Sequence, residues 1–205
     1  MELKEAINEL RKQPERKFDQ TVDLIVNLKG LDFRKTNLSF VVEVPNKVKD
    51  KTVCAFLNEK SELVPTITKP EFARFSDKKL LKNLVKKYDF FIAHASLMPS
   101  VASIFGKVLG PTGKMPSPQL GVMMKDGAEE IKNVLNKISK SAKIRIKDAS
   151  IKIAVGKISM SDDKLTQNIK SVYDGIVSAL PLKIDNVKKA LVKLTMSKPV
   201  EVQIK

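Results

Sequence analysis

The N-terminal part of the chain mixes apolar and polar residues in short, regular patterns. Residues 3–10 carry apolar side chains on one helical face, which predicts a short amphipathic helix that ends before Pro14. Residues 18–29 then alternate with period two, the pattern of a strand with one buried face. A second strand is predicted over residues 40–44, where Pro45 stops it.

The middle of the chain follows a different pattern. Residues 52–57 and 88–93 are short, almost unbroken apolar runs, which are typical of strands covered on both faces. Helical patterns accompany them around residues 80–85, 97–108 and 131–138. Strands that alternate with helices in this way predict a parallel, doubly wound sheet.

The half-buried pattern returns near the C-terminus. Alternating residues 151–155 predict a strand, and a long amphipathic helix follows that Ser161 opens and Pro181 ends. A further alternating segment, residues 191–204, closes the chain.

The two outer segments therefore share one style of sheet and the middle has another. We predict an α/β (α+β) protein with a discontinuous domain, residues 1–47 and 148–205, into which residues 48–147 are inserted as a second domain. Two connections, near Pro45–Val48 and Lys147–Asp148, would join the domains and act as a hinge.

The charge of the chain points to a polyanionic partner. Lys and Arg total 38 against 23 Asp and Glu, a net charge of +15. Such a balance favours nucleic acid first and an anionic membrane second. Divided at the predicted boundaries, the outer domain carries +5 and the insert +10. On charge alone, the insert is the stronger nonspecific binder of polyanions.

Several kinds of chemistry are excluded or disfavoured by composition. A single Cys (Cys54) and a single His (His94) exclude an intramolecular disulfide and a zinc site made of several such ligands. A nucleophilic Cys–His pair is numerically possible, although a Cys in an apolar run is usually a small buried side chain. No paired carboxylates stand out as acid–base groups or metal ligands, so we expect no enzyme activity, cofactor or metal. Without a signal peptide or a long apolar run, we expect a soluble cytoplasmic protein with no membrane partner.

A glycine-rich segment, residues 106–116, invites comparison with a phosphate-binding loop. Its spacing does not fit that motif, because Val108 stands where the first Gly belongs and Met115 where the closing Ser or Thr belongs. It can instead be a basic loop that offers Gly110, Gly113 and Lys114 to nucleic-acid phosphate. A loop that merely turns the chain is an equally good interpretation.

Three other segments combine basic, small polar and apolar residues. Residues 17–21 suit RNA, although Phe18 can also cap the core. Residues 155–160 offer Lys157 and Ser159 to phosphate, with an ordinary turn as the alternative. Residues 194–199 form a turn without Gly, a shape that suggests contact with a partner.

Taken together, these segments resemble the L-one family of large-subunit ribosomal proteins, found in the mobile lateral stalk. The matching motifs are in register over nearly the whole chain: residues 17–23, 110–116, 155–157 and 194–196. Residues 88–93 and 97–99 look like the archaeal branch. The resemblance implies a split β-α-β two-layer sandwich with an inserted Rossmann-like three-layer α/β/α domain. It also implies that the RNA site lies on the outer domain, against the charge argument.

The resemblance implies a specific set of RNA-binding residues. They are Lys17, Phe18, Thr21, Lys152, Lys157, Ser159, Lys189, Thr195, Met196 and Ser197. Lys152 and Lys189 stand where the family has other polar residues. Ser197-Lys198 departs from the usual Gly-Pro, which leaves the role of Ser197 open.

The expected function follows from this resemblance. It is a non-enzymatic, ribosome-associated protein, monomeric when free, that binds the rRNA of the lateral stalk. It would assist the release of deacylated tRNA from the exit site and repress translation by binding its own mRNA. A nucleotide-dependent enzyme would need a phosphate loop or a dinucleotide fingerprint, and a generic DNA binder a recognition helix; the sequence shows none of them.

Overall fold

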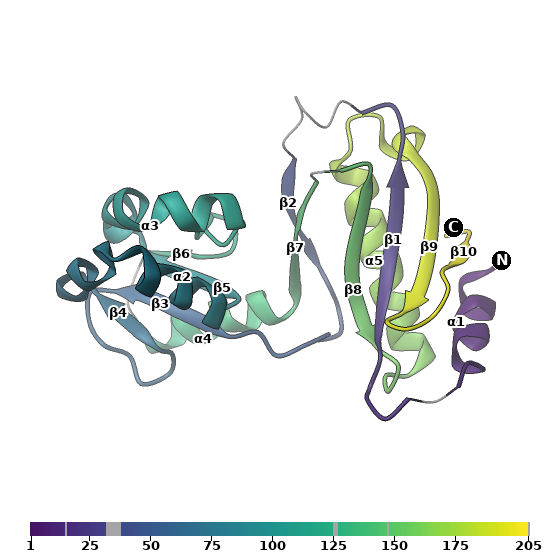
Figure 1. Ribbon diagram of the computed structural model, residues 1–205, viewed down its shortest axis with the longest axis horizontal. Helices are drawn as coiled ribbons and strands as arrows, with labels where there is room; N and C mark the ends of the chain where they lie inside the picture. The colour runs from purple at the N-terminus through teal and green to yellow at the C-terminus, as the bar shows by residue number, and fades with distance from the viewer. Residues whose placement is uncertain (15, 32–37, 125–126, 147, 205) are drawn as a thin grey trace. The chain divides into compact units, whose positions relative to one another are not determined.

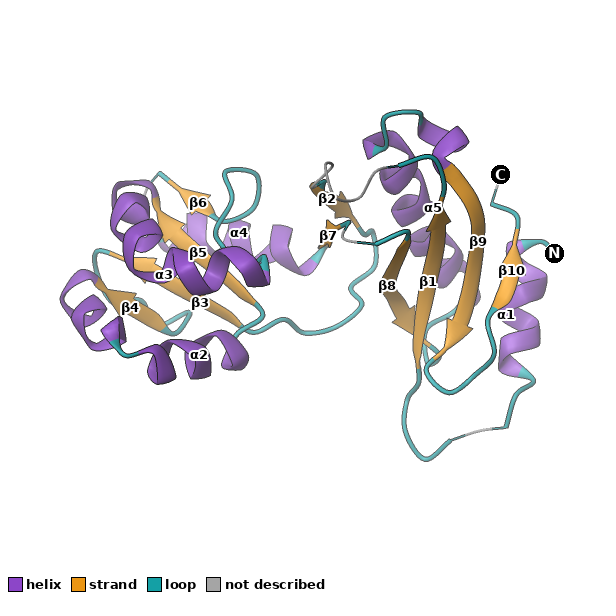
Figure 2. Ribbon diagram, turned by 45° about the horizontal axis from the view of Figure 1, so that its top comes forward, coloured by secondary structure: helices purple, strands orange, loops and turns teal. Residues whose placement is uncertain are grey.

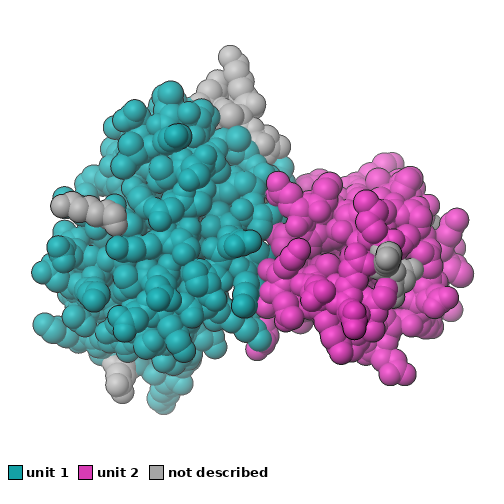
Figure 3. All heavy atoms as spheres, turned by 180° about the vertical axis from the view of Figure 1, so that it is seen from behind, with its two compact units in different colours: residues 1–49, 140–205 teal, residues 50–139 magenta. Residues whose placement is uncertain are grey.

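The chain folds into two compact units (Figures 1 and 3). The computed structural model describes residues 1–14, 16–31, 38–124, 127–146 and 148–204. The outer unit comprises residues 1–49 and 140–205, and the inserted unit residues 50–139. No described helix is both long enough and apolar enough to cross a membrane.

A four-stranded antiparallel sheet forms the centre of the outer unit (Figure 1). Its strand order is β10-β9-β1-β8, and every neighbouring pair is antiparallel. The strands are β1 (Thr21–Leu28), β8 (Ser150–Lys157), β9 (Val187–Leu194) and β10 (Val200–Val202). Buried and half-buried residues alternate strictly along β1, as the period-two pattern predicts.

Two helices cover one face of this sheet. They are α1 (Leu3–Arg11) and α5 (Asp162–Ala179), and a 3₁₀ turn, η3 (Lys183–Asn186), follows α5. The apolar faces of α1 and α5 join the inward residues of the strands in one core. Among the described helices of the outer unit, α1 and α5 therefore share one core on this side of the sheet.

The two ends of the chain lie side by side (Figure 1). Gln203 N–H donates to the carbonyl oxygen of Met1 at 3.0 Å, and Glu2 forms an isolated parallel bridge with Gln203. Both ends therefore belong to the same edge of the outer unit.

A separate two-stranded ribbon completes the outer unit. Strands β2 (Ser39–Glu43) and β7 (Ser141–Arg145) pair with each other, and β2 packs on α5. The packing is close, because a Cβ at Gly175 would lie 2.5 Å from Val42 Cγ1. The outer unit consequently takes up residues 140–147, which the sequence pattern had placed in the insert.

The first connection between the units is also fixed to the outer core. Asn46 N–H donates to Asn168 Oδ1 at 2.9 Å, and Asn168 Nδ2 donates back to the Asn46 carbonyl at 3.0 Å. Asn168 is buried in α5. The connection near residue 46, one of the two predicted hinge segments, is thus part of the outer unit. Lys147, in the other predicted hinge segment, lies outside the described residues.

The revised boundaries reverse the distribution of charge. Lys49, Lys140, Lys143, Arg145 and Lys147 move from the insert to the outer unit. The net charge of the outer unit rises from +5 to +10, and that of the insert falls from +10 to +5. The expectation that the insert is the more basic part is therefore wrong.

The inserted unit is built on a parallel sheet with the order β4-β3-β5-β6. The strands are β3 (Val53–Leu57), β4 (Thr66–Thr68), β5 (Phe90–His94) and β6 (Val122–Met123). The helices are η1 (Lys69–Ser76), α2 (Lys78–Lys87), η2 (Ala95–Leu97), α3 (Met98–Thr112) and α4 (Ala128–Ser139).

Helices cover both faces of this parallel sheet (Figures 1 and 2). Cys54, Phe56 and Phe91 share one cluster with α2 and α3, whereas α4 lies on the opposite face. All five residues of β3 are buried, as the unbroken apolar run predicts. The mixed α/β class is thus confirmed, with an antiparallel sheet in one unit and a three-layer parallel sheet in the other.

Candidate nucleic-acid interface

Three loops meet at one end of the four-stranded sheet, at the lower end of β1, β8 and β9 in Figure 1. They are residues 17–21, 157–160 and 194–198, named here the loop cluster. The strand register brings them together, because Thr21 lies opposite Lys157 and Val22 lies opposite Leu194. Segments more than 170 residues apart in the sequence therefore form one surface.

Backbone hydrogen bonds fix the turn after β9 against the start of β1. Thr21 N–H donates to Thr195 Oγ1 at 3.1 Å, and Thr195 N–H donates to the Thr21 carbonyl at 3.1 Å. Met196 N–H donates to Oε1 of Gln20 at 3.3 Å, and Gln20 is buried. Gln20 is a positioning residue that the sequence reasoning did not single out.

Ser197 closes the same turn with its side chain. Leu194 N–H donates to Ser197 Oγ at 2.8 Å, and Ser197 N–H donates to the Leu194 carbonyl at 3.1 Å. Among the described residues other than Gly, Lys183 alone has a positive φ, so position 197 has no conformational need for glycine. The hydroxyl thus stabilises the turn at a position where the family usually has Gly.

Asp19 ties the second loop to the first. Ser159 Oγ donates to Asp19 Oδ2 at 2.9 Å, Ser159 N–H donates to Oδ1 at 3.3 Å, and Lys157 Nζ lies 3.5 Å from Oδ2. The Ser159 hydrogen bond lowers the pKa of Asp19, with a smaller contribution from the Lys157 charge. Asp19 was not among the predicted contact residues, although it lies within the matching motif of residues 17–23.

Two large apolar side chains are exposed in the loop cluster. Phe18 is 52 % exposed and Met196 63 % exposed. The interpretation of Phe18 as a cap on the core does not fit this exposure. Apolar groups left in water beside lysines can pack on unstacked bases.

Lys152 and Lys189 lie away from the loop cluster. Lys152 is opposite Ile25 in the sheet, about 16 Å along β8 from Lys157. Lys189 is opposite Asn27, near the far end of β9, and forms an ion pair of 2.9 Å with Glu201. The remaining eight residues of the predicted set lie in the cluster.

The glycine-rich segment of the insert has an internal structural role. Helix α3 runs through Gly110, and Gly113 (φ 73°) ends it. Gly113 N–H donates to the Gly110 carbonyl at 3.0 Å, while Lys114 Nζ donates to the carbonyls of Val85 and Tyr88 at 2.7 Å each. Lys114 thus holds the C-terminal end of α2, which favours the interpretation of this segment as a turn over that of a phosphate loop.

The Cys–His pair has no structural support. Burial raises the pKa of the Cys54 thiol to about 12, so the thiol stays protonated near neutral pH. His94 lies 2.6 Å from Ser96 Oγ through Nδ1 and 2.9 Å from the Met124 carbonyl through Nε2. The described residues also contain no group of three or more His, Cys, Asp or Glu placed to hold a metal ion.

Comparison with known proteins decides the family. The model of the ribosomal protein L1p/L10e family matches residues 10–198. The chain belongs to this family. It is 34 % identical to large ribosomal subunit protein uL1 of Thermoplasma acidophilum, with 98 % of this chain and 96 % of the relative covered.

Two further uL1 relatives match this L1-family chain over almost its whole length. The one from Methanothermobacter thermautotrophicus is 34 % identical, covering 98 % of both chains. The one from Thermococcus kodakarensis is 30 % identical, covering 98 % of this chain and 96 % of the relative. The resemblance drawn from the motifs, including their archaeal type, is confirmed.

Proposed function

We propose that this L1-family chain is a structural, non-enzymatic constituent of the large ribosomal subunit that binds rRNA of the lateral stalk through the loop cluster. The observation that carries the proposal is the fixed turn of Thr195 and Met196 beside Phe18 and Lys157. The names and full coverage of the relatives support the same role.

The loop cluster has the properties that recognition of an irregular RNA requires. Hydrogen bonds hold its backbone in place before binding, which lowers the entropy lost when RNA docks. Phe18 and Met196 offer apolar surface for unstacked bases, and Lys17 and Lys157 neutralise phosphate. Recognition of this kind needs no catalytic group.

Two finer functions extend this proposal. A surface that recognises an RNA shape would also bind a messenger with a similar fold, so the protein would repress translation of its own mRNA. On the ribosome it would contact exit-site tRNA and assist the release of deacylated tRNA. Both rest on the family resemblance of the motifs in residues 17–23 and 194–196.

The test is a filter-binding series with stalk rRNA and a scrambled RNA of equal length. Thr195→Ala and Met196→Ala should each weaken binding of stalk rRNA by about 5- to 150-fold, because they alter a fitted contact. The scrambled RNA should lose much less affinity. Lys164→Ala, an exposed lysine of α5 outside the loop cluster, is the control.

Two results would contradict the proposal. One is equal binding of stalk and scrambled RNA by the unaltered chain. The other is loss of stalk-RNA affinity in Lys164→Ala as large as that in Thr195→Ala. Copurification with large-subunit rRNA supports the ribosomal role, whereas turnover of ATP by the pure protein would favour a nucleotide-dependent enzyme.

A further inference from the structure

Strands β7 and β8 follow each other closely in the chain but do not form a hairpin. In the part of the chain that the structure describes, β7 pairs only with β2, and β8 pairs only with β1. The two strands diverge instead, and a groove of about 420 Å³ lies between them. The groove belongs entirely to the outer unit.

The groove has an apolar side and a cationic side. Ile144 and Ile151 are buried in the outer core and line it from within. Lys143 and Arg145 flank Ile144, and Lys152 adjoins Ile151, so by strand alternation all three cations face away from the core. Among the described residues of the lining, Asp148 alone is acidic.

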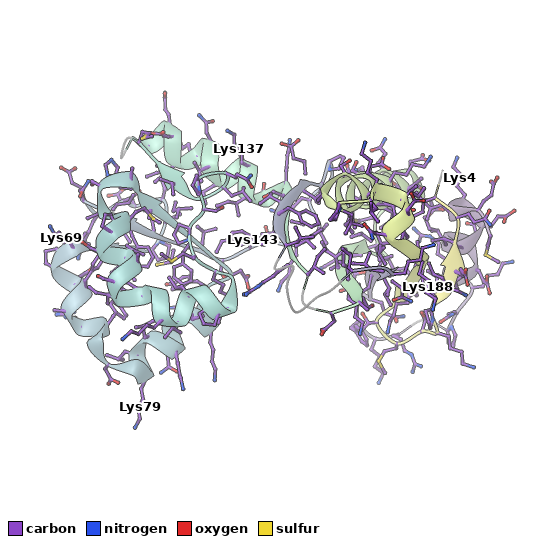
Figure 4. All side chains as sticks on the ribbon, turned by 90° about the horizontal axis from the view of Figure 1, so that it is seen from above. Lys4, Lys69, Lys79, Lys137, Lys143 and Lys188 are labelled. Atoms are coloured by element: carbon purple, nitrogen blue, oxygen red, sulfur yellow. The ribbon has the colours of Figure 1, made fainter. Side chains whose placement is uncertain are left out.

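The cations on β7 are held close together and partly out of water. Burial, followed by the like charge of Arg145, lowers the pKa of Lys143. Figure 4 labels Lys143 on the β2–β7 ribbon. Lys143 and Arg145 both belong to β7, so two cationic side chains lie on this side of the groove.

We propose that the groove between β7 and β8 binds the phosphate backbone of RNA, as a second contact beside the loop cluster. The proposal rests on the proposed function in that the same RNA would occupy both places. Strand β8 joins them: Lys152 lines the groove, and Lys157 lies in the loop cluster about 16 Å away. That distance is less than one turn of a nucleic-acid duplex, about 34 Å.

The groove also accounts for a residue that the loop cluster leaves out. Lys152 belongs to the set implied by the family resemblance but lies outside the loop cluster, opposite Ile25 in the sheet. Lys143 and Arg145 were not in that set, because the sequence pattern assigned them to the insert. The structure places these three cations around one groove.

An extended peptide is the competing occupant, because two strand edges could each take another strand. The lining argues against it. The described lining residues include three cations and one carboxylate, in a unit of net charge +10, and this balance favours a polyanion over an ordinary peptide.

The test uses the full chain with the double variant Lys143→Gln/Arg145→Gln. Because phosphate contacts carry no sequence information, affinity should fall by a similar factor, about tenfold at low salt, for stalk and scrambled RNA. The slope of log affinity against log salt should fall by about 1.5 to 2, for two lost contacts. The double variant Lys143→Arg/Arg145→Lys keeps both charges and should bind nearly as the unaltered chain does.

The matched control removes the same charge elsewhere in the outer unit. Lys4→Gln/Lys170→Gln changes exposed lysines on α1 and α5, and Lys4 lies well apart from Lys143 in Figure 4. It should lower affinity and slope much less. Thermal melts check that all three double variants fold.

The outcomes separate the groove from the proposed function. If Lys143→Gln/Arg145→Gln and Lys4→Gln/Lys170→Gln change affinity and slope equally, the groove is not an RNA site, whatever the loop cluster does. If the groove variant weakens both RNAs but Met196→Ala leaves discrimination unchanged, the groove stands and the loop-cluster proposal fails. Binding of a fluorescent ten-residue glutamate peptide that needs Lys143 and Arg145, with RNA affinity unchanged, would assign the groove to a peptide and overturn the proposal.

Discussion

At the scale of single residues, the loop cluster depends on side chains that organise other side chains. Gln20 and Ser197 hold the turn after β9, and Asp19 holds Lys157 and Ser159. Under the proposed function, Asp19 would have two opposing effects on RNA binding. It orders the second loop, and it also places a negative charge beside the lysine that would meet phosphate.

We predict that Asp19→Asn reduces the preference for stalk RNA over scrambled RNA but does not reduce the general affinity for RNA. Loss of the ordered loop should weaken stalk-RNA binding by about three- to tenfold, a typical net cost of one lost hydrogen bond. Scrambled RNA should bind equally well or better, because one negative charge is gone. The measurement is the ratio of the two dissociation constants, with Asp174→Asn on α5 as a control of equal charge change. Equal ratios in the two variants would contradict the assignment of Asp19.

The hydrogen bonds between Asp19 and Ser159 should respond to pH in a defined direction. The pKa of Asp19 is lowered below its ordinary 3.8. The hydrogen bonds from Ser159 to the carboxylate are therefore fully formed above pH 3.8, and they are lost as the pH falls through the lowered pKa of the folded protein. The Ser159 amide resonance should therefore shift with a midpoint below 3.8. A midpoint at or above 3.8 would show that Ser159 does not stabilise the carboxylate.

At the scale of elements, the contact between α5 and the β2–β7 ribbon defines the outer unit. Gly175 lets Val42 approach the helix backbone, and a Cβ there would lie 2.5 and 2.8 Å from the two Val42 methyl carbons. A glycine inside a helix ordinarily costs about 1 kcal/mol relative to alanine. Here that cost is offset by the packing of the ribbon.

We predict that Gly175→Ala lowers the free energy of unfolding by about 1–3 kcal/mol, because overpacking outweighs the gain in helix propensity. Gly106→Ala in α3 is the matched control, since a Cβ there meets nothing within 4 Å. That control should raise stability by about 0.5–1 kcal/mol. Urea unfolding measures both, and adding Val42→Ala to Gly175→Ala should restore part of the loss. Stabilisation by Gly175→Ala would show that the ribbon is not seated on α5.

The elements also show what the sequence could and could not predict. Strand β1 was predictable because a one-sided core imposes alternation, and β3 because helices on both faces require an unbroken apolar run. Strand β7 was missed because its lysine and arginine face outward beside few apolar residues, which resembles a polar connection. Its partner β2 lies about a hundred residues earlier, and such long-range pairing leaves no local signal.

Predictability of the site differs between its parts. Residues 17–21 and 194–198 could be found because their motifs are specific to a family, and sheet register then brought them together. Lys114 could not be assigned correctly, since its partners are carbonyls at the end of another helix. The groove could not be predicted either, because one of its sides is β7 and the sequence pattern did not reveal that strand.

At the scale of the whole molecule, the outer unit holds both proposed RNA contacts and most of the net charge. We predict that residues 1–49 joined by a short linker to residues 140–205 fold on their own and keep most of the specific affinity for stalk rRNA. A shorter version, residues 1–47 joined to 148–205, lacks β7 and leaves β2 without its paired strand. The shorter version should therefore melt at a lower temperature and bind with a smaller salt slope.

Melting curves and filter binding over a salt series distinguish the two versions. The isolated insert, residues 50–139, serves as the control and should bind stalk and scrambled RNA alike. Specific affinity in the isolated insert would contradict the placement of the site. Equal stability of the two outer versions would show that β7 adds nothing to the outer core.

The hydrogen bond between Gln203 and Met1 gives the outer unit an unexpected continuity. Because the chain ends adjoin at one edge, a peptide bond between them would turn the outer unit into one uninterrupted stretch, from residue 140 through the joined ends to residue 49. The insert would then be the part cut open, and circular permutants with new ends among residues 50–139 would keep the loop cluster and the groove on an unbroken chain. The outer unit is therefore discontinuous along the chain but would be continuous in such a permutant.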